Sequence, residues 1–141
     1  MQILLLILST IAVIITLIIL SACKHKAEIA PGCIAGPGGK MAVILFAVHD
    51  STFLLNFPGH PDTAFVKFST TSSPGTHPKD YDSFFIGDPG EDHIHCIGLK
   101  CGKYYFYRTA WDSAAHVIRY GGYGLILPDS AGFRLINVTV K

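Results

Sequence analysis

Apolar residues are arranged differently in the two parts of this chain. Residues 3–20 form an uncharged run of Ile, Leu, Val, Ala, Ser and Thr, whereas the later part alternates short apolar segments with turn-forming residues. Residues 41–48 are a continuous apolar run, too short to cross a bilayer and typical of a central strand covered on both faces. Residues 63–70 alternate apolar and polar positions, which predicts a strand with one buried face.

The remaining segments also favour strands. Residues 82–86 and 93–97 flank a stretch rich in Gly, Pro and Asp, which predicts a β-hairpin with a long turn. Further strands are expected over residues 103–109, 116–120, 123–127 and 133–140. No window of ten or more residues after residue 22 has a good helical period. The sequence therefore predicts an all-β fold, a single antiparallel β-sandwich of about seven strands.

Glycine and proline separate the two parts of the chain. Residues 23–40 carry charges near their start and then the stretches Pro31-Gly32 and Gly36-Pro37-Gly38-Gly39. Gly and Pro at this density cannot hold a helix or bury a core, so the segment predicts a flexible tether. The sandwich domain is then expected over residues 41–141.

The apolar run ends in Leu20-Ser21-Ala22-Cys23, and Lys24-His25-Lys26 follows at once. This order resembles the lipobox of bacterial lipoproteins. The resemblance implies that residues 1–22 are a signal peptide that is removed, and that Cys23 is lipidated. The alternative is an uncleaved transmembrane helix, because eighteen apolar residues can span a bilayer. Met1-Gln2 does not provide the basic region with which a signal peptide usually begins. For an uncleaved helix, the positive-inside rule applied to Lys24 and Lys26 would hold the domain in the cytoplasm.

The lipoprotein interpretation predicts a location in the cell envelope. Two or more acyl chains hold a protein stably at a membrane, so the membrane is an expected partner through the N-terminal acyl chains. Lys24 stands where lipoproteins retained at the inner membrane of Gram-negative bacteria carry Asp, and the resemblance thus implies the outer membrane. The chain has 11 basic and 10 acidic side chains without a basic stripe, which argues against a nucleic-acid partner.

A second motif lies in the sequence Leu99-Lys100-Cys101-Gly102-Lys103-Tyr104-Tyr105. It resembles the Leu-x-Pro-Gly-x-x-Tyr corner of fibronectin type III domains, with Leu99, Gly102 and Tyr105 matching and Cys101 in place of the proline. The pattern is also similar to prealbumin-like repeats. The resemblance implies that Leu99 enters the core and that the Tyr105 hydroxyl bonds back to the backbone. The chain as a whole resembles small lipoproteins of Gram-negative bacteria that carry one such sandwich.

Three cysteines remain besides Cys23, namely Cys33, Cys96 and Cys101. An oxidising compartment permits disulfides, and an odd number leaves at least one thiol unpaired. Cys96 and Cys101 are close in sequence and could pair if the chain reverses between them. The alternative is that Cys96 is a small buried apolar residue and Cys101 a turn residue.

His93 and His95 are the candidate metal ligands. They are two residues apart on a predicted strand, so both imidazoles project from one face, and Glu91 or Asp92 is near enough to supply a third ligand. The alternative is a pair of solvated histidines. No Gly-x-Ser-x-Gly motif or phosphate-binding loop is present, so the chain is not expected to be an enzyme or to need a cofactor.

Two further patterns concern the surface. Trp111 and the tyrosines near it could form an exposed aromatic platform for a glycan or protein ligand, although the same rings could fill the sandwich. Four Asp-Ser/Thr-apolar tripeptides resemble acceptors of bacterial O-glycosylation, with the acceptors Ser51, Thr63, Ser113 and Ser130.

These observations predict a lipid-anchored, non-enzymatic surface module of the cell envelope with an unidentified ligand. A small metal-binding lipoprotein that uses His93 and His95 is one alternative. A structural envelope subunit that assembles by strand addition at an open sheet edge is the other.

Overall fold

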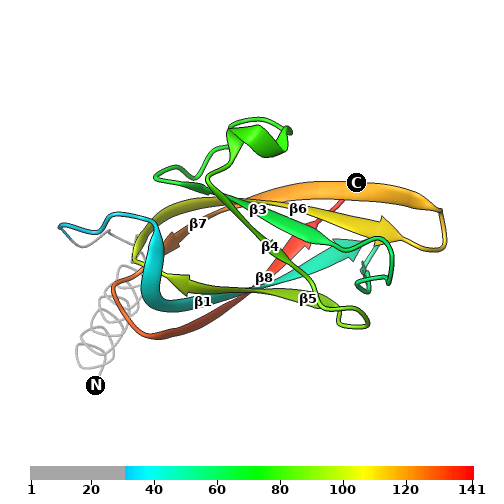
Figure 1. The fold of residues 1–141 in the computed structure, drawn as a ribbon, viewed down its shortest axis with the longest axis horizontal. Coiled ribbons are helices and arrows are strands. Elements are labelled where there is room, and N and C mark those ends of the chain that lie inside the picture. The colour runs from blue at the N-terminus through cyan, green and yellow to red at the C-terminus, as the bar shows by residue number, and fades with distance from the viewer. Residues whose placement is uncertain (1–30) are drawn as a thin grey trace, which may run out of the picture.

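The computed structural model describes residues 31–141, which form two packed β-sheets (Figure 1). The first sheet contains β1 (Pro37–His49), β2 (Thr52–Phe53), β5 (His93–Leu99) and β8 (Gly132–Thr139). The second contains β3 (Thr63–Phe68), β4 (Ser83–Ile86), β6 (Gly102–Asp112) and β7 (Val117–Leu127). The 3₁₀ turn η1 (Pro78–Asp80) is the one helical element of this part of the chain. The predicted all-β sandwich is confirmed, with eight strands.

β1 is the central strand of the first sheet. It pairs antiparallel with β5 on one side and parallel with β8 on the other. The short strand β2 pairs antiparallel with the C-terminal end of β1. The second sheet has the order β4-β3-β6-β7 and is antiparallel throughout. The expected hairpin between residues 82–86 and 93–97 is wrong, because these strands belong to different sheets and their connection crosses the sandwich.

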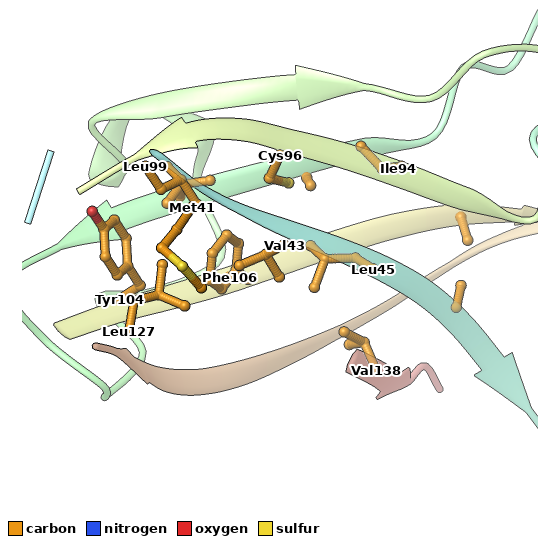
Figure 2. Close-up of a cluster of buried hydrophobic side chains, with 14 of the residues drawn as sticks. Met41, Val43, Leu45, Ile94, Cys96, Leu99, Tyr104, Phe106, Leu127 and Val138 are labelled. Carbon is orange, nitrogen blue, oxygen red and sulfur yellow. The ribbon is translucent and has the colours of Figure 1, made fainter. Parts of the chain in front are cut away.

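The core lies between the inner faces of the two sheets (Figure 2). Alternate residues of β1, among them Val43 and Leu45, are fully buried against Phe106 of β6. The residues between them, such as Ile44, are only half-buried. The expectation that residues 41–48 would be covered on both faces is therefore wrong, because the first sheet packs on one side and leaves its other side to solvent.

The N-terminal boundary of the domain lies earlier than residue 41. β1 begins at Pro37, and the Gly36 N–H donates to the Tyr104 hydroxyl over 2.9 Å. A Cβ atom at Gly39 would meet the Leu99 carbonyl oxygen at 2.0 Å, so this glycine permits close packing of two backbones. The predicted tether of residues 23–40 is thus wrong for residues 33–40. Its first part, including Cys23 and the segment 23–30, lies outside the described residues.

The disulfide joins Cys33 to Cys101, so the pairing of Cys96 with Cys101 is wrong. Cys96 has a free thiol and is fully buried on the inner face of β5, while Cys101 lies in the turn between β5 and β6. Strand alternation directs the Cys96 side chain into the core, and the disulfide instead holds the N-terminal segment against this turn.

The corner around Gly102 has a different tyrosine from the one expected. Leu99 is buried in the core as predicted, and Gly102 has a φ of +137° beside Ala35. Tyr104, however, donates its hydroxyl hydrogen to the Lys100 carbonyl over 2.8 Å. Tyr105 lies on the opposite face of β6, so its expected role belongs to Tyr104.

Strand β7 also differs from the expectation of two short strands. It runs without a break through Gly121, Gly122 and Gly124. A Cβ atom at Gly121 would meet the Thr139 carbonyl oxygen at 2.0 Å. Backbone hydrogen bonds between Tyr120 and Lys141 close the sandwich at this point. These glycines allow other parts of the chain to approach the backbone of β7 closely, and they do not form a turn.

Candidate metal site at the start of β5

The first residues of β5 bring two imidazoles and a carboxylate together on the outer face of the first sheet. Ile94 and Cys96 point inward and are buried, so His93 and His95 project outward, and they share one face as their spacing predicted. Glu91 lies two residues before β5 begins and is beside both rings. Phe46 of β1 flanks the site, with its ring centroid 5.3 Å from that of His93.

The three potential ligand atoms are close enough to share one metal ion. His93 Nε2 lies 2.9 Å from His95 Nε2 and 3.6 Å from Glu91 Oε2, and His95 Nε2 lies 3.9 Å from the same Oε2. Ligand atoms bound at about 2.0–2.1 Å to a tetrahedral zinc ion lie about 3.3 Å from one another. The observed separations bracket this value, so a single ion fits with small side-chain movements.

Asp92 orients the first imidazole. Its Oδ1 lies 2.7 Å from His93 Nδ1, an arrangement in which Nδ1–H donates to the carboxylate and Nε2 keeps its lone pair. Carboxylates commonly hold metal-binding imidazoles in this way and raise their basicity. Asp92 therefore acts behind the site, whereas Glu91 faces it.

The Glu91 carboxylate has an unpartnered atom. Its Oε2 is covered from solvent and has no hydrogen-bond partner among residues 31–141, although the side chain as a whole is partly exposed. A buried polar atom without a partner is costly and calls for an explanation. A cation between Glu91 and the imidazoles would supply the missing partner.

Asn56, far away in sequence, holds the loop that carries the site. The Asn56 amide nitrogen donates to the carbonyl oxygens of Asp88 at 3.0 Å and His93 at 2.9 Å. The Asn56 backbone N–H donates to the Glu91 carbonyl over 2.6 Å. The Asn56 side chain is buried, so these bonds fix both ends of the loop. Sequence reasoning missed Asn56, since no local pattern links it to the histidines.

A buried ion pair lies behind Asn56. Arg108 of β6 donates through Nη2 to Asp62 Oδ2 at 3.0 Å and to Asn56 Oδ1 at 3.3 Å, and through Nη1 to the Leu45 carbonyl. Burial raises the pKa of Asp62 and lowers the pKa of Arg108, against the hydrogen bond between them. The sequence analysis did not predict this ion pair either, because nothing in the aromatic segment around Arg108 indicates that this side chain points inward.

The other sequence-derived candidates are spread over the surface. Ser51, Ser113 and Ser130 are exposed outside strands, whereas Thr63 is half-buried at the start of β3. Cys33, Cys101 and Asp129 also lie close together, but the two sulfurs are bonded to each other and offer no thiolate ligand.

The aromatic residues do not form one platform. Trp111 stacks on His60 with ring centroids 4.1 Å apart, whereas Tyr107 contacts Tyr81 at 5.7 Å, Tyr120 at 6.1 Å and Phe65 at 6.3 Å. Tyr104 is in the core. The rings are therefore divided among the interior, a cluster around Tyr107 and the Trp111–His60 pair.

No family model, curated protein or solved structure matches this chain. In the described part of the chain, no helix is long and apolar enough to span a membrane. The geometry of residues 91–95 is thus the main guide to function.

Proposed function

We propose that the protein is a non-enzymatic, lipid-anchored envelope protein that binds a divalent transition metal through Glu91, His93 and His95. The convergence of these three ligand atoms, with one carboxylate oxygen left unpartnered, carries the proposal. The third ligand that the sequence left open between Glu91 and Asp92 is Glu91.

The ligand set favours zinc. Two imidazole nitrogens and one carboxylate oxygen suit Zn²⁺, whereas Ca²⁺ and Mg²⁺ prefer oxygen ligands alone. Cu²⁺ binds such ligands more tightly in the intrinsic order of affinities and would compete when present. Three protein ligands leave a fourth position for water or for a donor atom of another molecule.

Metal binding would require a hydrogen to move away from the two facing imidazole nitrogens. The 2.9 Å separation between His93 Nε2 and His95 Nε2 requires one of these nitrogens to carry hydrogen in the metal-free protein. Both nitrogens must offer lone pairs to the ion, so that hydrogen moves when the metal binds, either to Nδ1 of the same imidazole or to solvent. Asp92 keeps the Nδ1–H of His93 in place throughout.

A thermal-shift titration of the full chain in detergent with ZnCl₂ tests the proposal. Zinc at a hundredfold excess over its dissociation constant stabilises the folded state by about 2.7 kcal/mol, a rise in melting temperature on the order of 10 °C. His95→Ala and Glu91→Gln should abolish most of this rise, and EDTA should reverse it. His77→Ala, which removes an exposed histidine beside η1, is the matched control. An equal rise in all variants, or none in the natural chain, would refute the metal site.

The lipid anchor in the proposal is supported by the lipobox ending at Cys23. Metabolic labelling with a clickable palmitate analogue, followed by membrane fractionation, tests it independently of the metal. Label should enter the natural chain and be absent from Cys23→Ala. An unlabelled natural chain in the membrane fraction would indicate the uncleaved helix instead.

A further inference from the structure

The disulfide ties the domain to the segment that follows the proposed membrane anchor. Cys33 is joined to Cys101 in the turn between β5 and β6, and Cys23 precedes Cys33 by ten residues. Ten residues span at most about 35 Å when fully extended. With the anchor of the proposed function, the membrane would therefore be within this distance of Cys33, whether it is reached by acyl chains on Cys23 or by an uncleaved apolar segment ending there.

The end of the domain nearest this attachment exposes large apolar side chains. The first residues of β1, the last residues of β5 and the connection from β7 to β8 lie together at this end (Figure 1). Its exposed apolar residues, here called the anchor-end patch, have relative exposures of 60–74% and are Ile34, Ile97, Phe133 and Leu135.

Strand register places most of this patch on one surface. Phe133 of β8 is paired with Ala42 of β1, and the next outward pair is Leu135 with Ile44. Cys96 is paired with Val43 and points inward, so Ile97 points outward beside Ala42. Ile97 and Phe133 thus stand on either side of the small Ala42 side chain, on the solvent face of the first sheet.

Positive charge lies next to the apolar side chains. Lys40 and Lys100 are exposed and line a groove of about 780 Å³ at this end, together with Ile34 and one acidic residue, Asp129. Lys24 and Lys26 precede it in the sequence. Exposed apolar side chains bordered by lysines are the combination that binds the interface of a bilayer containing anionic lipids.

We propose that the anchor-end patch docks on the bilayer to which the N-terminus is attached, with Phe133 and Ile97 entering the interface and Lys40 and Lys100 facing lipid phosphates. The proposal rests on the membrane anchor of the proposed function but not on the metal. His95, the metal ligand nearest to the patch, lies two residues before Ile97 along β5, about 7 Å away, and is paired with Ile44, so the metal site borders the docked surface.

Quenching of tryptophan by brominated lipid tests the orientation. The full chain is reconstituted into vesicles of phosphatidylcholine and phosphatidylglycerol with brominated acyl chains, in a Trp111→Phe background that removes the natural tryptophan. Phe133→Trp reports on the patch, and Ile118→Trp reports on an equally exposed site in the second sheet. Tryptophan at position 133 should lose about half of its emission relative to unbrominated vesicles, and tryptophan at 118 almost none.

The contribution of the two lysines beside the patch is tested with a separate control. Lys40→Glu combined with Lys100→Glu should reduce the quenching at position 133, whereas Lys79→Glu within η1 should leave it unchanged. If brominated lipid quenches the two tryptophan positions to the same extent in protein that floats with the vesicles, docking alone is overturned. A blue shift at position 133 without bromine quenching would also overturn it, since a second copy of the chain would then cover the patch. Protein that fails to float would overturn both the anchor and the docking.

Discussion

Reduction of the Cys33–Cys101 disulfide should destabilise the domain strongly. The bond closes a loop with a sequence separation of 68 residues, and the chain-entropy relation for a loop of this length gives about 4.4 kcal/mol at 25 °C. A domain of this size typically has an unfolding free energy of about 5–15 kcal/mol. With a urea m-value of about 2 kcal/mol per molar, the unfolding midpoint should fall by about 2 M.

The assay is urea unfolding of the full chain in nonionic detergent, with and without reducing agent. A Cys33→Ser, Cys101→Ser double variant is the control, because its midpoint should already be low and should not respond to the reductant. Trypsin cleaves after Lys100 and separates Cys96 from Cys101, so peptide mapping identifies the bonded pair. An unchanged midpoint on reduction, or a Cys96–Cys101 linked peptide, would refute the reasoning.

Three further predictions concern buried and paired groups. Arg108→Met should cost about 3–5 kcal/mol in urea unfolding, because it leaves the Asp62 carboxylate buried without its partner; adding Asp62→Asn should recover part of the loss, and a neutral Arg108→Met would contradict the ion pair. Burial raises the pKa of Cys96 to about 12, so iodoacetamide at pH 8 should alkylate this thiol only after unfolding, and rapid native labelling would show that it is accessible. The hydrogen bond from Arg119, together with two backbone N–H groups, holds the pKa of Asp112 below its usual 3.8. Its stabilising effect is therefore present above that value and lost as pH falls through the lowered pKa, so Asp112→Asn should make stability less dependent on pH in the acid range.

Local patterns predicted the fold class and much of the core. Alternation along residues 63–70 identified the buried Ala64 and Val66, and the spacing of His93 and His95 correctly placed both on one face. These features depend on a strand's two-residue period, which any strand pairing preserves. Glycine-rich segments were harder to interpret, since glycine serves both flexible chain and close backbone packing, as at Gly39.

By itself, the sequence determined that strands would form, which side of residues 63–70 would be buried, and that two imidazoles would stand side by side. Only the tertiary structure decided that Cys33 would be the partner of Cys101, that Asn56 would hold the metal loop, and that Arg108 would meet Asp62 in the core. The physical reason is the separation along the sequence of the residues that determine each feature. Strand periodicity follows from neighbouring residues, whereas each of these contacts joins residues dozens of positions apart and depends on the register and stacking of both sheets.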